Sequence, residues 1–139
     1  QRQMCIRDST YPAKSEFFMP LTAKKAGLLL RSLEFRVKGY MPGKMRTVLR
    51  KYGTTTALAD KSIDLVRGYN DVVLDMGSIA LEKGVEYQLY FAAANNFYPP
   101  SVDSSWVAAN DCIDIAHGSA YYGDNTTLIF SGTVVLQET

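Results

Sequence analysis

Residues 85–93 read VEYQLYFAA, and this stretch decides the fold class. Apolar or aromatic side chains occupy every second position: Val85, Tyr87, Leu89, Phe91 and Ala93. The positions between them carry Glu86, Gln88, Tyr90 and Ala92. A period of two places alternate side chains on opposite faces of a β-strand. We therefore expect a strand here with one buried face.

The same alternation marks further strands at residues 16–21, 29–38, 44–53, 63–66, 72–76, 113–115 and 128–136. Pro20 is expected to end the first of these, because proline has no amide hydrogen to donate. Arg31 interrupts the inward series of the second and predicts a β-bulge or a late strand start. Residues 40–43, YMPG, predict a turn that joins the second and third strands as a hairpin.

The chain offers one candidate helix, the short stretch 21–30, and otherwise shows only strand patterns separated by turn residues. Many short strands with turn signals between them are typical of two antiparallel sheets packed face to face. The sequence therefore predicts an all-β fold: an antiparallel, jelly-roll-like β-sandwich of seven or eight strands with little or no helix.

The first nine residues, QRQMCIRDS, show neither the strand period nor the helix period. Within them, QMCIRDS resembles the conceptual translation of a sequencing-library adapter, a tail found on proteins predicted from metagenomic assemblies. A short natural arm is the alternative. We expect residues 1–9 to be a non-native tail and residues 10–139 to form one domain. This interpretation leaves open that the domain is the C-terminal part of a longer protein.

Composition sets limits on the class of protein. About 130 residues suffice to bury a core without a metal or disulfides. With Cys5 set aside, Cys112 is the one remaining cysteine, which argues against an intrachain disulfide but is compatible with an extracellular location. The sequence has no run of 18 apolar residues, so we expect no membrane segment.

Charge is balanced in total but divided along the chain. Without residues 1–9 there are 13 basic and 13 acidic residues. Residues 24–67 hold 11 basic and three acidic residues, whereas residues 71–139 hold nine acidic residues and one lysine. The basic half taken alone would suit a polyanion. Pairing of early strands with late ones explains the uneven charge distribution better, because opposite charges then meet across the sheet. We therefore expect no nucleic-acid partner.

This division leads to a specific expectation about ion pairs. The cations Arg36, Lys38, Arg46 and Arg50 should lie within reach of acids such as Asp75, Glu82, Glu86 or Asp114. If instead the two halves formed separate faces, copies would associate positive face to negative face, and salt would weaken that association.

Leu81, Gly84, Tyr87 and Leu89 form a phrase, apolar-x-x-Gly-x-x-Tyr-x-apolar, between two expected strands. With the strand order around it, the phrase resembles jelly-roll modules of phage tail, fibre and head-decoration proteins and of bacterial surface proteins. The aromatic residue that usually precedes this phrase is replaced by Tyr69 at a looser spacing. The resemblance spans about 110 residues and implies that Gly84 permits a tight turn and that Tyr87 fills the core.

The residues do not assemble a known catalytic pattern. Cys112 and His117 are close in sequence, but we expect Cys112 to point away from His117. Carboxylates that could serve glycoside hydrolysis are Asp103, Asp111, Asp114 and Glu86, yet an acidic half-chain supplies such candidates by chance. Oxygen ligands for Ca²⁺ are available from Asp111, Asp114, Asp124 and Asn125, without a spacing that fixes a site. We therefore expect no enzyme and no cofactor, with Ca²⁺ as an open alternative.

Aromatic residues in segments without core periodicity are the best functional candidates. They are Phe97, Tyr98 and Trp106 in a predicted loop, and Tyr121 and Tyr122 beside a glycine-containing turn. Exposed aromatic rings stack on sugars and anchor protein interfaces. The alternative for Trp106 is that it closes one end of the sandwich.

Two functions remain open. The first, favoured by the resemblance, is a non-enzymatic structural or attachment module of a virion that contacts other virion proteins or further copies of itself. The second is a carbohydrate-binding module of a bacterial surface protein or secreted enzyme, with a cell-surface glycan as partner. Both imply a virion or extracellular location.

Overall fold

A computed structural model describes residues 2–4, 14–102, 111–115 and 129–139, and the described residues contain strands but no helix. The strands are β1 (Arg2–Met4), β2 (Lys14–Ala23), β3 (Leu28–Gly39), β4 (Gly43–Lys51), β5 (Ala59–Leu65), β6 (Gly68–Leu81), β7 (Glu86–Tyr98), β8 (Ser101–Val102), β9 (Ile113–Asp114), β10 (Ile129–Phe130) and β11 (Gly132–Glu138). Seven of these have seven or more residues, in agreement with the predicted seven or eight.

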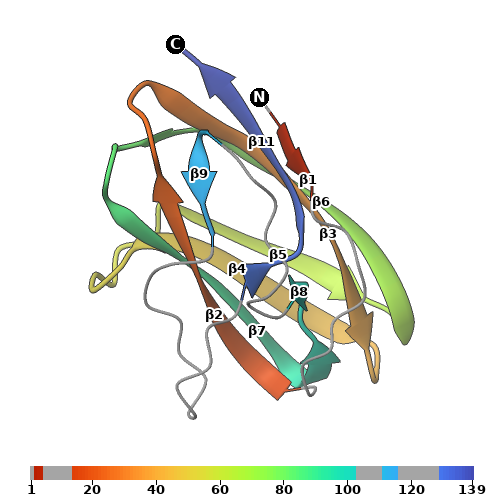
Figure 1. The fold of residues 1–139 in the computed structure, drawn as a ribbon. Coiled ribbons are helices and arrows are strands. Elements are labelled where there is room, and N and C mark those ends of the chain that lie inside the picture. The colour runs from red at the N-terminus through yellow and green to blue at the C-terminus, as the bar shows by residue number, and fades with distance from the viewer. Residues whose placement is uncertain (1, 5–13, 103–110, 116–128) are drawn as a thin grey trace.

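The strands form two layers, seen in Figure 1. One layer has the order β1-β11-β3-β6, and the other has the order β9-β2-β7-β4-β5. Among the described strands of these two layers, one ladder crosses from layer to layer, where Lys38 of β3 lies opposite Tyr98 of β7. All ladders between these strands are antiparallel. The predicted all-β sandwich is confirmed.

The core lies between the layers. Phe35 of β3 meets Phe91 of β7 edge to face, with ring centroids 5.4 Å apart, and Phe130 packs on both rings. Tyr87, Leu89 and Phe91 are fully buried, as the alternation in residues 85–93 predicts. Burying one such large side chain stabilises the fold by about 1.5–3 kcal/mol. The sequence pattern thus identified the strand that organises the core.

Two irregularities predicted in the strands have different outcomes. The bulge at Arg31 is confirmed, because the β3–β6 register shifts between Leu30 and Ser32. The prediction that Pro20 ends a strand is wrong: β2 runs through Pro20, which lies opposite Gln88. Proline is tolerated here because β9 pairs with β2 only at Thr22 and Ala23 in the described part of the chain.

Residues 40–42 do form a turn between β3 and β4, but not a hairpin. β4 pairs with β5 and β7, whereas β3 pairs with β6, β11 and the end of β7. The turn therefore carries the chain from one layer to the other. Gly43 is not among the described glycines with positive φ, so it does not supply a left-handed position. Alternation within each strand cannot distinguish a hairpin from such a crossing.

The Leu81–Leu89 phrase has a clear structural basis. Gly84 has φ +78°, and its amide donates a hydrogen bond to the carbonyl of Ala23 at 2.9 Å. The fully buried Tyr87 accepts a hydrogen bond at its hydroxyl from the backbone N–H of Glu82 at 2.8 Å. The expected structural roles of Gly84 and Tyr87 are therefore confirmed.

Part of the N-terminal segment is incorporated in the sheet. Arg2, Gln3 and Met4 pair with Val135, Val134 and Thr133 of β11. A free sheet edge accepts an extended segment through backbone hydrogen bonds, whatever its side chains are. This pairing is therefore compatible both with a non-native tail and with a natural arm.

Basic residues of the first half form ion pairs with acidic residues of the second half, in part as predicted. Five ion pairs join described residues: Lys25–Glu138, Arg36–Asp71, Lys44–Asp64, Arg46–Asp60 and Lys51–Glu82. Three of them link the basic half to the acidic half. Arg36 and Arg46 do pair with acids, although with Asp71 and Asp60 rather than with those we named, while Arg50 bonds the amide oxygen of Gln88.

Candidate functional site

The structure separates the two neighbouring aromatic candidates Phe97 and Tyr98. Strand β7 extends to Tyr98, so the predicted loop begins later than expected. Phe97 keeps the inward parity of Leu89 and Phe91, is fully buried, and packs edge to face on Phe17 at 5.2 Å. Its ring therefore belongs to the core and offers no face to a partner, which corrects the expectation that it binds one. Tyr98 is half-buried and points to the other side.

Several sequence candidates lie outside the described residues. They are Trp106, Tyr121 and Tyr122 of the aromatic set, together with Asp103, His117, Asp124 and Asn125. Of the remaining candidate ligands and acids, Asp111 is exposed, and Asp114 and Glu86 are half-buried. Within the described ranges, no three His, Cys, Asp or Glu side chains gather closely enough to hold a metal ion.

Tyr98 belongs to a surface at the end of the sandwich where the layers join, which we call the tyrosine–cation surface. In Figure 1 this is the end at which β3 and β7 finish and β4 and β6 begin. Its members are Arg36, Lys38, Tyr40, Met41, Arg67, Tyr69 and Tyr98. They come from β3, the β3–β4 turn, the β5–β6 turn, β6 and β7.

Strand register brings the aromatic rings around Lys38. Lys38 lies opposite Tyr69 in the β3–β6 ladder and opposite Tyr98 in the β3–β7 pairing. Its Nζ is 5.4 Å from the ring centroid of Tyr69 and 5.6 Å from that of Tyr98. These are cation–π distances, each worth about 0.5–1 kcal/mol at exposed sites. The ammonium of Lys38 is therefore held between two tyrosines.

Two phenol hydroxyls lie side by side on the same surface. The hydroxyl oxygens of Tyr40 and Tyr98 are 2.9 Å apart, and their rings meet at 5.4 Å. The hydrogen bond to Tyr98 is the main cause that raises the pKa of Tyr40, and burial adds to it. Tyr40 therefore stays protonated at neutral pH. One hydroxyl donates to the other, which leaves one O–H and several lone pairs for a ligand.

Asn70 fixes the turn that presents Arg67. Its Oδ1 accepts a hydrogen bond from the N–H of Val66 at 2.8 Å, and its Nδ2 donates to the carbonyls of Val66 and Gly68 at 3.0 Å each. The backbone of Arg67 also forms a bridge with Gly39, next to Lys38. The Asn70 side chain thereby holds Arg67 and Tyr69 beside β3.

The cations of this surface are not equally compensated. Arg36 donates from Nε to Oδ1 of Asp71 at 2.9 Å, and its guanidinium lies 5.3 Å from the Tyr69 ring centroid. Within the described residues, neither Lys38 nor Arg67 forms an ion pair with a carboxylate. The surface therefore carries excess positive charge beside three tyrosines.

The outer face of the β9-β2-β7-β4-β5 layer carries a second aromatic group whose polar atoms bond one another. Phe18 and Tyr90 have ring centroids 4.7 Å apart, and the guanidinium of Arg50 lies 5.7 Å and 5.6 Å from them. Arg50 donates to Gln88, and the Tyr90 hydroxyl donates to Glu16 at 2.7 Å. Burial is the main cause that raises the pKa of Tyr90. These contacts explain stability better than ligand binding.

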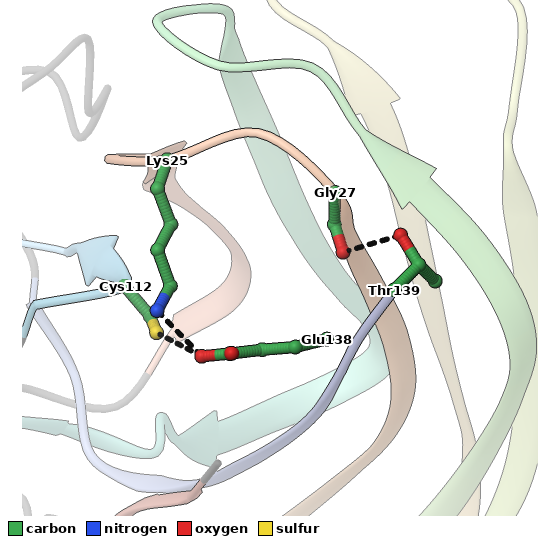
Figure 2. Close-up of polar contacts among 5 residues, drawn as sticks. All are labelled: Lys25, Gly27, Cys112, Glu138 and Thr139. Carbon is green, nitrogen blue, oxygen red and sulfur yellow. Dashed lines mark hydrogen bonds and ion pairs between the residues drawn. The ribbon is translucent and has the colours of Figure 1, made fainter.

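Cys112 lies in a cluster that fastens the chain end, shown in Figure 2. The carboxylate of Glu138 accepts hydrogen bonds from Lys25 at 2.5 Å and from the buried thiol of Cys112 at 3.8 Å. Lys25 lowers the pKa of Glu138, and Glu138 in turn raises the pKa of Lys25. Thr139 bonds the carbonyl of Gly27 through both its amide and its hydroxyl. This cluster joins the β2–β3 turn to the end of β11.

Sequence reasoning missed most of the tyrosine–cation surface. It selected Tyr98 but used Lys38 and Arg36 only as members of a charge ladder. The contacts of Lys38 depend on register between β3, β6 and β7, which alternation within one strand does not reveal. One feature of the sequence could have pointed to this surface: Tyr69 is two residues before Asp71, so both side chains lie on the exposed face of the same strand.

No protein-family model, no curated protein and no solved structure matches this chain. Within the described residues, no helix has the length and apolar character needed to span a membrane. The functional argument therefore rests on the geometry of the surfaces.

Proposed function

We propose that this domain is a non-enzymatic structural or attachment module of a virion, of the type found in phage tails, fibres and capsid decorations. Its partner, another virion protein or a further copy of the chain, would contact the tyrosine–cation surface. The location that follows is a virion or an extracellular surface. The resemblance of residues 81–89 to jelly-roll modules supports the class of protein.

The observation that carries the proposal is the gathering of exposed aromatic and sulfur-containing side chains at one end of the sandwich. Tyr40 is 48% exposed, Met41 57% and Tyr69 55%. Tyrosine, methionine and arginine are enriched in protein interfaces, and tyrosine and arginine dominate binding hot spots. Tyr69 lies on β6 next to the Asn70-bonded turn, and Tyr40 is hydrogen-bonded to Tyr98 of β7, so these two side chains lose little conformational entropy on binding.

Sedimentation of the purified chain over a concentration series tests the self-association form of this proposal. We expect reversible association that Tyr69→Ala weakens about tenfold, since truncation of a hot-spot residue costs about 1–2 kcal/mol. Tyr52→Ala is the matched control, because Tyr52 is 52% exposed but lies in the β4–β5 turn. The proposal would be contradicted if the protein is strictly monomeric and the genes that neighbour its own encode no capsid, portal or tail protein.

A carbohydrate-binding module is the second candidate. The specific observation in its favour is the phenol pair of Tyr40 and Tyr98 next to the ammonium of Lys38, because rings and hydroxyls together match the apolar face and the hydroxyls of a sugar. A glycan array tests it. Saturable binding that is lost in Tyr98→Ala supports this candidate, and a blank array contradicts it.

A further inference from the structure

We propose that the tyrosine–cation surface binds the carboxylate of an acidic saccharide, a sugar of the uronic or sialic acid type, with Lys38 as the anion-binding residue. This inference rests on the proposed role of that surface as the binding surface. It adds the chemical class of the ligand.

The first step concerns the anion. Lys38 offers three N–H donors and has no carboxylate partner among the described residues, whereas Arg36 is paired with Asp71. The rings of Tyr69 and Tyr98 flank the ammonium and limit the positions that it can take. Arg67, beside Gly39, adds a second cation without an acid partner among described residues. A carboxylate bound here would meet an ammonium that is already positioned, which strengthens a charge-assisted hydrogen bond.

The second step concerns the sugar hydroxyls. The hydroxyl oxygens of Tyr40 and Tyr98 are 2.9 Å apart, similar to the separation of adjacent hydroxyl oxygens on a pyranose ring. Both phenols can donate and accept. A sugar with its carboxylate on Lys38 could therefore exchange hydrogen bonds with this pair through a neighbouring hydroxyl.

The third step concerns the apolar face of the sugar. Tyr40 and Tyr69 expose about half of their surface, 48% and 55%. Aromatic rings stack on the C–H groups of pyranoses, and this contact requires exposed ring area next to the polar groups. The surface provides anion, hydroxyl and stacking contacts within one group of residues.

Other anions use fewer of these features. Inorganic phosphate would bind Lys38 and Arg67 without needing the rings. A nucleic acid would need a continued row of uncompensated cations, but Arg36, Lys44 and Arg46 are each paired with an aspartate. The combination of an ammonium with no carboxylate partner among the described residues, a phenol pair and half-exposed rings favours the acidic saccharide.

Titration calorimetry of the full chain tests the inference with four probes: sialyllactose, a galacturonic acid tetrasaccharide, neutral lactose and inorganic phosphate. We expect saturable binding of at least one acidic saccharide. Lactose should bind at least about tenfold more weakly, because it has no carboxylate to accept a hydrogen bond from Lys38. Phosphate should also bind at least about tenfold more weakly, because it makes no contact with the aromatic rings.

Two variants locate the site. Lys38→Met removes the ammonium but keeps an unbranched side chain, and Tyr98→Phe removes one hydroxyl but keeps the ring. Each should weaken acidic saccharide binding about tenfold, in line with the loss of one such charge-assisted or hydroxyl contact. Lys61→Met is the control, because Lys61 is also an exposed strand lysine but lies on β5. Thermal unfolding of each variant verifies the fold.

The outcomes separate this inference from the proposed function. Absence of binding to both acidic probes, equal binding of lactose or phosphate, or binding unchanged in Lys38→Met would overturn the inference. If Tyr69→Ala still weakens self-association in that case, the proposed function stands alone. If an acidic saccharide binds but the chain never associates, the ligand assignment stands and the protein-contact form of the proposed function fails.

Discussion

The hydroxyl of Tyr87 accepts a hydrogen bond from the backbone N–H of Glu82 at 2.8 Å, across the turn between β6 and β7. Tyr87 is fully buried, so this bond satisfies a polar atom in the core and also fixes the turn. Gly84, with φ +78°, allows the chain to reverse within that turn. The bond therefore joins the end of one layer to the central strand of the other.

Removal of this hydroxyl should destabilise the domain. Tyr87→Phe leaves the N–H of Glu82 without that acceptor, so we expect a loss of about 1 kcal/mol in the free energy of unfolding. Urea unfolding followed by circular dichroism measures it. Tyr52→Phe, at an exposed tyrosine, is the control and should change the unfolding free energy by less than about 0.5 kcal/mol. Equal stability of the two variants would remove the structural role assigned to the Tyr87 hydroxyl.

A substitution at Gly132 tests how closely β11 packs against β3. A Cβ added at Gly132 would lie 2.5 Å from the carbonyl oxygen of Glu34 and 2.7 Å from the ring of Phe130. Gly132→Ala should therefore cost about 1–3 kcal/mol of stability through forced backbone shifts. Gly43→Ala is the matched control, because its nearest contact would be 3.6 Å away. A stable Gly132→Ala protein with unchanged unfolding would contradict the β3–β11 register.

Acid stability should depend on Asp60. Hydrogen bonds from the Arg46 guanidinium, at 2.9 Å and 2.6 Å, hold the pKa of Asp60 below its ordinary value. A carboxyl whose pKa is lower in the folded state stabilises the fold above its unfolded pKa, about 3.9. That contribution is lost as the pH falls through the folded pKa. When the free energy of unfolding is measured between neutral and strongly acidic pH, it should fall less steeply with decreasing pH in Asp60→Asn than in the unaltered chain.

Arg46→Met supplies the partner variant for this measurement. It removes the cation that lowers the pKa of Asp60, so its acid decline should also be shallow, and the double variant should add little further change. If stability falls with decreasing pH as steeply in both single variants as in the unaltered protein, the Arg46–Asp60 pair is not the source of the acid sensitivity.

Self-association should respond weakly to salt. The ion pairs Arg36–Asp71, Lys44–Asp64 and Lys51–Glu82 place opposite charges next to each other, so the described surface does not divide into one positive and one negative face. Light scattering at about 0.05 M and about 0.5 M salt should therefore give similar masses, although exposed charges are screened beyond roughly 10 Å. Oligomers that dissociate at the higher salt concentration would instead favour association between opposite faces.

The fold was predictable from the sequence where one strand face is buried. The alternation in residues 85–93 identified the inward set of β7, and Arg31 marked the bulge in β3. Pairing between strands was not predictable to the same degree. The turn at residues 40–42 crosses between layers, and nothing in the alternation of either flanking strand distinguishes that path from a hairpin.

The same limit explains the partial prediction of the candidate site. Tyr98 was selected because the segment after Asn95 lacks a clear period, but the parity of β7 continues through Phe97 and buries that residue. Lys38, Tyr40 and Tyr69 come together through long-range register between β3, β6 and β7. Such contacts depend on the tertiary arrangement and leave little trace in the local sequence.

The backbone pairing of Lys38 with Tyr98, which joins β3 to β7 at one end of the sandwich, has a mechanical consequence. A tensile load that separates the layers at this end would act first on these two residues, and both belong to the tyrosine–cation surface. A ligand or partner that bridges them would resist that separation. In a force spectroscopy experiment, occupancy of the surface should therefore raise the rupture force of the domain, so that adhesion and resistance to shear would depend on the same side chains.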